Sequence, residues 1–249
     1  MDDVIRSLAT DIRTAETTVA LTGAGVSTAS GMPSFRGDDG IWGDEFDPDT
    51  FHIRRFETDP VGFWADRVRL RERMQPEAAG PNAAHNAFAR LQACGALSAV
   101  ITQNTDGLHT AAGTRRVLEL HGNARRVVCQ RCGERRDAEW AFEVAKGSGD
   151  PPTCSCGGIY KPAVVLFGEA LDPALVRDAR RRVANSDLLL VAGTSLQVDP
   201  AASLPAQRQG ATLAVINLET TPLTANADYD IREDVTDVLP KIAKAACRR

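Results

Sequence analysis

Four cysteines in the middle of the chain have the spacing of metal ligands. Cys129 and Cys132 form one pair, and Cys154 and Cys156 form a second pair after an interval of 21 residues. Two short turns that supply four thiolates suit a closed tetrahedral zinc site. A redox dithiol is the alternative, although a redox centre needs only one such pair. Because four thiolates leave no open position on the metal, we expect the zinc to stabilise the fold and take no part in catalysis.

A run of small residues forms a candidate phosphate-binding turn. Gly23, Ala24 and Gly25 follow a predicted strand, and Ser27 and Thr28 come directly after them. Backbone amides in such a turn can approach a phosphate closely. The dinucleotide fingerprint is incomplete, because Thr28 replaces its third glycine and no acidic residue ends a second strand about twenty positions later. A plain strand-to-helix turn stays open as the alternative.

An aromatic ring and a guanidinium follow this turn, at Phe35 and Arg36. Arg36 is placed to clamp a pyrophosphate, because a guanidinium binds phosphate oxygens with two parallel hydrogen bonds. The alternative is a buried phenylalanine next to a surface arginine.

Polar residues follow the next predicted strand, at Gln103, Asn104, Thr105 and Asp106. Side-chain amides at this place suit the amide of nicotinamide or a ribose hydroxyl. His109, a little further on, is interpreted as structural.

Two later strands also end in polar residues. Gly193, Thr194 and Ser195 follow one strand, and Asn217, Leu218 and Glu219 follow the other. These groups suit an adenosine, and the carboxylate of Glu219 can accept both hydroxyls of a ribose. For each loop, a polar turn without a function remains the alternative.

The elements that must position these residues alternate between strands and helices. Short apolar runs predict strands at 17–21, 97–102, 187–192 and 212–217, and apolar residues at helical spacing predict helices at 3–16, 83–93, 172–184 and 235–246. Parallel strands need helical crossovers, so the pattern predicts an α/β fold with a doubly wound parallel sheet. Its ligands are expected at the carboxyl ends of the strands.

Two stretches interrupt this alternation, namely 46–80 and the cysteine-containing 124–165. We interpret them as a small helical and zinc-binding domain inserted into a large domain made of 1–45, 81–123 and 166–249.

The composition narrows the possible partners and location. The 29 basic and 33 acidic residues give a net charge of −4 and are mixed along the chain, so nucleic acid is not an expected partner. No apolar run has the ~20 residues that a membrane span needs, and the N-terminus lacks a signal peptide, so a cytoplasmic protein is expected. In a reducing compartment, Cys94 and Cys247 are expected to be ordinary thiols.

Seven motifs taken in order resemble those of the sirtuins. They are Gly23–Ser27, Phe35–Gly37, Thr102–Asp106, His121–Asn123, the paired cysteines, Phe167–Glu169 and Gly193–Ser195. Each motif is weak alone, but the resemblance spans nearly the whole chain. It implies a Rossmann-like large domain, a small zinc-bearing domain, and a cleft between them in which an acyl-lysine meets NAD.

The resemblance also assigns site residues. It implies an NAD site that draws on the glycine turn and the strand ends named above, with Phe35, Arg36 and Val235. It implies catalytic roles for His121, Asn104 and Asp106, with His121 as the general base, and a substrate-binding segment that includes Val165, Phe167, Gly168 and Glu169.

The implied reaction is removal of an acetyl group from a protein lysine, which yields nicotinamide, the free lysine and O-acetyl-ADP-ribose. His121 would help a ribose hydroxyl attack the acyl carbon, a task that suits an imidazole whose pKa is near neutrality. Removal of succinyl or other acyl groups, or mono-ADP-ribosyl transfer, are the alternatives. Acylated proteins are the expected partners, and we expect a monomer.

The acyl preference is predicted from Trp64 and Arg67. Family members that prefer acidic acyl groups carry a tyrosine and, three residues later, an arginine. Here Trp64 stands where the tyrosine is expected, with Arg67 in place. Because loss of the phenol removes a hydrogen-bond donor to a succinyl carboxylate, worth about 1.5–3 kcal/mol, we predict deacetylation as the main activity.

Overall fold

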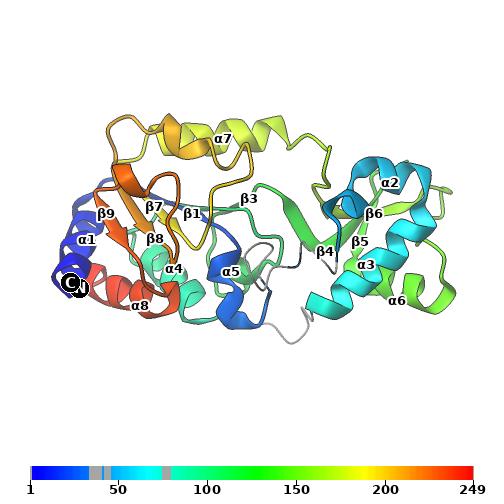
Figure 1. Cartoon of the computed structure of the whole chain (residues 1–249), viewed down its shortest axis with the longest axis horizontal. Coiled ribbons are helices and arrows are strands. Elements are labelled where there is room, and N and C mark those ends of the chain that lie inside the picture. Colours follow the sequence, from blue (N-terminus) through cyan, green and yellow to red (C-terminus); the bar gives the residue numbers. More distant parts are fainter. Residues whose placement is uncertain (1, 34–40, 42–45, 75–79, 249) are drawn as a thin grey trace.

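The chain folds into a larger and a smaller body that lie side by side. The computed structural model describes residues 2–33, 41, 46–74 and 80–248, so the predicted site residues Phe35 and Arg36 lie outside the described residues. In Figure 1 the larger body, on the left, holds both termini, and the smaller body, on the right, holds α2, α3 and α6. Strand β4 extends from the junction into the smaller body.

The larger body is built on a six-stranded sheet in the order β3-β2-β1-β7-β8-β9, in which every pairing is parallel. All five residues of β1 and of β7 are buried, as expected for a sheet covered on both faces. This confirms the predicted doubly wound fold. The strands are β1 (Thr18–Thr22), β2 (Ala99–Thr102), β3 (Val117–Glu119), β7 (Leu188–Ala192), β8 (Thr212–Ile216) and β9 (Tyr229–Ile231).

Helices cover both faces of this sheet. On one face, α1 (Asp2–Thr14), α4 (Ala83–Ala93) and α8 (Val235–Ala246) share one hydrophobic core with the strands, and on the other face α7 (Pro173–Ala184) shares a second. The apolar residues of α1 recur at helical spacing and are buried, which fixes the face that packs on the sheet. The short helix α5 (Leu108–Ala111) follows β2. Short 3-10 turns occur in the described connections of the larger body at Ala24–Val26, Thr28–Ser30, Leu204–Gln207 and Thr224–Asn226, and before α2 in the smaller body at Pro48–Phe51.

The strand order reverses between β1 and β7. From β1 the chain builds outward through β2 and β3, whereas β7 to β9 build outward on the other side. At such a point the loops that leave the two central strands diverge and open a crevice at the carboxyl edge of the sheet. The loops that begin at Gly23 and Gly193 therefore border the place where this fold binds ligands.

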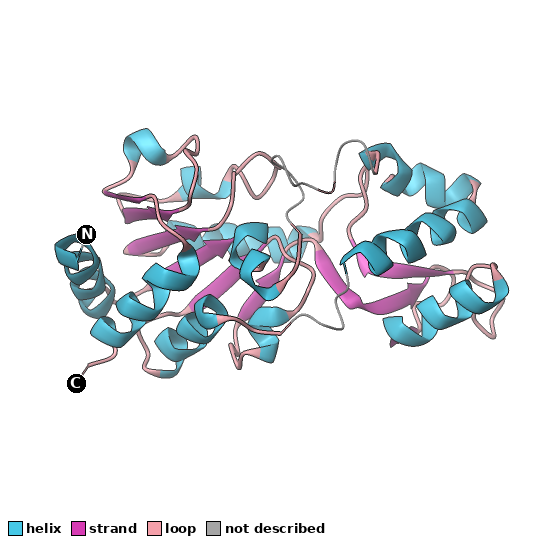
Figure 2. Ribbon diagram, turned by 60° about the horizontal axis from the view of Figure 1, so that its bottom comes forward, coloured by secondary structure: helices cyan, strands magenta, loops and turns pink. Residues whose placement is uncertain are grey.

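The smaller body has its own sheet and core. Antiparallel strands β5 (Arg135–Asp137), β4 (Gly122–Cys129) and β6 (Tyr160–Val164) pair in that order. Helices α2 (Ile53–Thr58), α3 (Pro60–Met74) and α6 (Ala138–Ser148) pack with this sheet around a largely aromatic cluster. Figure 2 shows these helices beside the small sheet. The predicted boundary between residues 123 and 124 falls inside β4, so one strand leads from one body into the other.

Cys94 and Cys247 form a disulfide, so the prediction that both are ordinary thiols is wrong. Cys94 is the C-cap of α4 and Cys247 is the C-cap of α8. The two helices pack along each other and bring the two ends together. The pair is separated by 153 residues, and no local pattern could predict the contact.

Within the described part of the chain, no helix has both the length and the apolar character that a membrane crossing requires.

Candidate active site and metal centre

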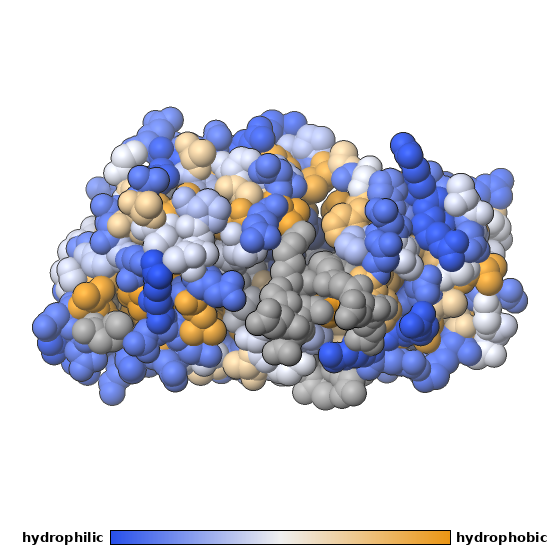
Figure 3. Space-filling model, viewed as in Figure 1, coloured by the Kyte–Doolittle hydropathy of each residue, from blue (hydrophilic) through white to orange (hydrophobic). Residues whose placement is uncertain are grey.

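A cleft of about 990 Å³ runs between the two bodies. Figure 3 shows the hollow, with apolar side chains at its upper edge. Residues from both bodies line it, and most of the predicted site residues are among them. These are Gly23, Ala24, Gly25, Thr28, Arg67, Gln103, Asn104, Thr105, His121, Val165, Phe167, Gly168, Glu169, Gly193, Thr194, Ser195, Asn217, Leu218, Glu219 and Val235.

The glycine turn and the loop after β7 touch through their backbones. Gly25 donates its N–H to the carbonyl of Gly193 at 2.9 Å. A Cβ on Gly25 would lie 2.9 Å from the Cα of Gly193, and a Cβ on Gly23 would lie 2.7 Å from the Cβ of Thr194. Gln103 joins the third loop to this pair, because its side-chain amide donates to the Thr194 hydroxyl at 2.8 Å. The close backbone approach fits a site that holds the phosphates of NAD.

A hydrogen-bonded layer lies directly behind this wall. The buried amide of Asn104 donates to the Ser27 hydroxyl at 3.0 Å, and Ser27 donates to Asp106 at 2.7 Å. Neither Ser27 nor Asp106 is among the residues that line the cleft. Both therefore lie one step behind the wall and hold Asn104, which does line it.

His121 lies at the junction of the two bodies with its ring orientation fixed. Its Nδ1 is 2.9 Å from the carbonyl oxygen of Gln103. Because that oxygen can only accept a hydrogen bond, Nδ1 carries the proton in the neutral ring and Nε2 keeps the lone pair. Burial lowers the pKa of His121, against the opposing effect of the bond to Gln103. The neutral, proton-accepting form is therefore favoured at neutral pH.

The segment from Val164 to Glu169 forms the wall contributed by the smaller body. Val165 donates its N–H to the His121 carbonyl at 2.8 Å, and Phe167 pairs with the chain at Phe51 and Ile53. Beneath it, the buried ammonium of Lys161 contacts Glu169 at 2.9 Å and the Val164 carbonyl at 2.7 Å. Burial lowers the pKa of Lys161, and Glu169 opposes this shift. The same carboxylate accepts the Leu166 N–H at 2.7 Å, so Glu169 closes the turn from Leu166 to Glu169, on which Phe167 is 37% exposed.

Trp64 does not line the cleft, contrary to its predicted place in the acyl pocket. It is 1% exposed, its indole N–H donates to the Tyr160 carbonyl at 3.0 Å, and its ring packs edge-on against Phe142. The face of α3 that borders the cleft instead carries Arg67, Leu70 and Met74. These positions follow the helical repeat, which turns Trp64 into the core.

Arg67 brings a positive charge into this part of the cleft. Its Nε is buried without a hydrogen-bond partner, and no ion pair joins it to a carboxylate of the described residues. Its guanidinium lies 5.7 Å from the centre of the Phe51 ring. Burial, with a smaller effect of Arg71, lowers the pKa of Arg67 to about 10, so the group stays charged at neutral pH.

Several residues that line the cleft were not predicted. Asp234 caps α8 just before Val235, and an aspartate ahead of an apolar helix was a usable signal. The apolar residues had no signal, because an apolar residue in a core and one in a ligand site look alike in a sequence. The unpredicted residues are Phe51, Leu70, Met74, Ala124, Val164, Leu166, Leu171, Glu233 and Asp234.

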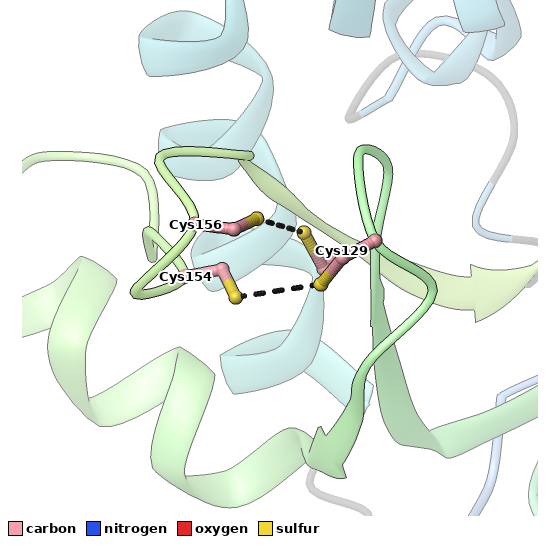
Figure 4. Close-up of side chains that lie close together, drawn as sticks. Cys129, Cys154 and Cys156 are labelled. Carbon is pink, nitrogen blue, oxygen red and sulfur yellow. Dashed lines mark hydrogen bonds between the residues drawn. The ribbon is translucent and has the colours of Figure 1, made fainter.

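The four predicted metal ligands come together in the smaller body, away from the cleft. Their sulfur atoms all lie within 4.8 Å of one another. Cys129 is 3.6 Å from Cys156 and Cys132 is 3.7 Å from Cys154 (Figure 4). Four sulfurs at ~2.3 Å from a tetrahedral Zn²⁺ would be about 3.8 Å apart. The residues therefore fit a closed structural zinc site that joins the turn after β4 to the loop before β6.

A parallel sheet with a glycine turn at its switch point, a cleft against a second body and a four-thiolate centre together define a dinucleotide-binding α/β enzyme with a structural metal module. The model of the Sir2 family matches residues 23–200. The chain belongs to this family, the sirtuins.

Relatives with similar sequences and structures align with almost the whole chain. An NAD-dependent protein deacetylase of Haloarcula marismortui is 56% identical, covering 97% of this chain and 94% of the relative. The structure of a Sir2 homologue with NAD is 40% identical, with a TM-score of 0.87 and coverage of 96% and 93%. A Sir2 structure with a deacetylated p53 peptide and 3′-O-acetyl ADP-ribose is 34% identical, with a TM-score of 0.90 and coverage of 98% of both chains.

Proposed function

We propose that this protein removes acetyl groups from protein lysines with NAD as co-substrate, and releases nicotinamide, the free lysine and O-acetyl-ADP-ribose. The observation that carries the proposal is the placement of His121, whose proton-accepting Nε2 has no hydrogen-bond partner among the described residues. His121 lines the same cleft as the glycine turn, and its carbonyl accepts the Val165 N–H at 2.8 Å. The names of the relatives given above support the same activity.

The residues of the larger body would hold NAD along the carboxyl edge of the sheet. The amides of the glycine turn face the phosphates, Glu219 faces an adenosine ribose, and Gln103 and Asn104 face the nicotinamide ribose. When bound, NAD supplies the ribose that accepts the acyl group and a nicotinamide that leaves. Asn104 is buried and bonded to Ser27, so its amide presents a fixed hydrogen-bonding group.

His121 would act as the general base. Its Nδ1–H is held by Gln103, so Nε2 is the atom that takes a proton from a ribose hydroxyl. The same bond stabilises the ring after protonation, because it remains a donor bond in the imidazolium.

The substrate would bind as an extended chain. The segment at Val165 to Phe167 is extended and partly exposed, and its backbone can pair with a peptide. Pairing through the backbone gives affinity with little dependence on sequence. The acylated lysine then reaches inward toward His121.

Mass spectrometry of the products tests this function. The protein is incubated with NAD and an acetylated peptide, and the proposal predicts free nicotinamide and O-acetyl-ADP-ribose in equal amounts. Release of free acetate without the ADP-ribose ester would overturn it. Label from NAD on protein instead of the ester would support the ADP-ribosyltransferase alternative.

Removal of a carboxylated acyl group, such as succinyl, is the second candidate activity. The observation that favours it is the charge of Arg67 in the cleft, which no carboxylate of the described residues neutralises. Glu169, which also lines the cleft, is already bonded to Lys161. The prediction of deacetylation as the main activity depended on Trp64, which does not line the cleft, so of the two residues only Arg67 can contact an acidic acyl chain.

Acyl preference can be measured with the R67M variant. If Arg67 binds a carboxylate, the variant loses kcat/KM for a succinyl peptide by about tenfold or more and keeps it for an acetyl peptide. R69M is the matched control, because Arg69 lies on the same helix and its side chain is 64% exposed. Equal losses on both peptides would exclude a role in acyl selection.

The division into domains 1–45, 81–123 and 166–249 against 46–80 and 124–165 also stays a proposal, as do a monomeric state, a cytoplasmic location and the absence of nucleic-acid binding. The Cys94–Cys247 disulfide is unusual for a reducing compartment. The redox state of this pair in cells is therefore the measurement that tests the location.

A further inference from the structure

His121 lies in a very short passage between the two bodies. Glu119 is the last residue of β3 in the large sheet, and Gly122 is the first residue of β4 in the small sheet. Only Leu120 and His121 lie between them. Leu120 is buried and continues the pairing of β3, since its N–H donates to Thr102. The position of His121 therefore depends on how the two strands are held at this turn.

The turn itself has a conformation that needs glycine. Gly122 has a φ of +79°, and a Cβ there would lie 2.1 Å from the carbonyl oxygen of Ala163. Backbone freedom at a glycine gives the turn no rigidity of its own. Backbone bonds from Val165 to His121 and from Ala124 to Thr105, each at 2.8 Å, hold parts of the turn, and side-chain contacts add to them.

Two side chains span the turn and join its ends. The amide nitrogen of Asn123 donates to both carboxylate oxygens of Glu119, at 2.8 and 2.9 Å. The amide oxygen of Asn123 accepts from the backbone N–H of Arg125 at 2.9 Å and from its Nε at 3.4 Å. The amide cannot rotate by half a turn, because its two ends have different partners.

The Glu119–Asn123 pair lies next to residues of the candidate site. Arg125 covers Gly107, where a Cβ would overlap the guanidinium, and Gly107 directly follows Asp106. Glu119 is half-buried, and burial raises its pKa, against the opposing effects of Asn123 and Arg125. Partial burial of a carboxylate costs free energy unless hydrogen bonds within the protein compensate for its lost hydration.

We propose that Glu119 and Asn123 form a clasp that positions His121. The clasp joins the last residue of β3 to the second residue of β4, across the turn that carries His121. It holds the base over the cleft while the two bodies bind their separate substrates. Neither side chain lines the cleft, so both are positioning residues. The clasp depends on the proposed role of His121 as the base.

Reversing the polarity of the clasp tests it. In E119Q an amide nitrogen faces the Asn123 nitrogen, so one of the two bonds is lost, and in N123D two carboxylates face each other, so both are lost; neither change alters the volume much. In the double variant E119Q/N123D the new amide donates to the new carboxylate, which can still accept from Arg125. Expected values are a kcat reduced by about tenfold or more in each single variant, and a kcat within about threefold of wild type in the double variant.

The Michaelis constant for NAD separates positioning from a general loss of structure. It should change by less than about threefold in all three variants, because the glycine turn is untouched. E143Q is the control, since Glu143 is an exposed carboxylate on α6. Single variants with wild-type kcat would overturn the clasp, and so would a double variant as slow as the slower single one. If a single variant does not fold, the kcat of the double variant alone tests the clasp.

A second readout does not need catalysis. The chain has four histidines, so the imidazole NMR signals can be assigned with H121Q. The His121 signal should shift in each single variant and return in the double variant. A wild-type protein without deacetylase activity would defeat the proposed function, whereas an unmoved His121 signal in the single variants would defeat the clasp.

Discussion

Gly25 and Gly193 meet through their backbones at 2.9 Å, and this contact joins the loops of the two central strands, β1 and β7. The contact exists because neither residue has a Cβ. A Cβ on Gly193 would lie 2.5 Å from the backbone nitrogen of Val26, and its φ is +58°. The phosphate-binding edge of the sheet is thus closed by two glycines that are far apart in the sequence.

Substitution of Gly193 by alanine should damage both stability and NAD binding. The added methyl group pushes the loops apart, so we expect a loss of about 1–3 kcal/mol in the free energy of unfolding and a Kd for NAD raised by about tenfold or more. Gly210→Ala is the control, because Gly210 has a similar positive φ of +78° but open space around it. If the two variants bind NAD equally well, backbone strain and not loop contact explains the loss.

Zinc removal should unfold the smaller body. A metal held by the four cysteines would join the turn after β4 to the loop before β6, so we expect one zinc per chain and a marked fall in Tm with a strong chelator. Cys154→Ser should lose the zinc, while Cys94→Ser should retain it. A chelated protein with an unchanged Tm would show that the metal is not needed for the fold.

Reduction of the Cys94–Cys247 bond should destabilise the chain without stopping catalysis. The bond closes a separation of 153 residues, and loops of this size give about 2–5 kcal/mol of stabilisation. Urea unfolding with and without a reductant measures the loss. The double variant C94S/C247S should have the same free energy of unfolding as the reduced protein, and the reductant should not change it. Identical unfolding curves for the oxidised and reduced protein would mean that the bond contributes nothing.

Acid should destabilise the protein in part through His109. Burial lowers its pKa to about 3, with a smaller effect of His85, so the ring stays neutral in the folded protein while it is protonated in the unfolded chain below pH 6.5. The unfolded state then binds more protons, and stability falls as the pH drops from about 6.5 toward 3. Between pH 7.5 and 4.5 this should amount to about 2–3 kcal/mol.

The variant His109→Gln isolates this contribution. It removes the titrating ring and keeps a group that can bond to Thr22, which His109 contacts at 3.0 Å. Urea unfolding at the two pH values should show a smaller loss in the variant than in the wild type. Equal losses would assign the acid sensitivity to other groups.

Much of the fold could be predicted because burial leaves a local pattern. Helices Ala83–Ala93 and Val235–Ala246 match their predicted ranges, and the strands at β1, β7 and β8 lie within a residue or two of theirs. Each of these elements has an apolar run or stripe bounded by polar or turn residues. The cysteine cluster was equally predictable, because ligand spacing within a short turn is local.

Two features could not be predicted, namely which face of α3 is buried and which residues far apart in the sequence are in contact. In α3, apolar and aromatic residues occur at Phe63, Trp64, Val68 and Leu70 between charged ones, so the sequence does not reveal which face is buried. The family resemblance assigns Trp64 to the acyl pocket, whereas its side chain lies in the core. The partner of Cys94 lies 153 residues away, and that contact follows only from the packing of α4 on α8.

The variant His121→Gln tests most directly whether His121 is the general base. The variant keeps a polar side chain in the cleft but cannot accept a proton at neutral pH. We expect deacetylation of an acetyl peptide to fall by about 10²–10⁴-fold, with the Kd for NAD within about threefold of wild type. In the wild type, kcat/KM should fall on the acid side only below pH 6.5, because burial lowers the pKa of His121. A His121→Gln variant that deacetylates at the wild-type rate would contradict the role of His121.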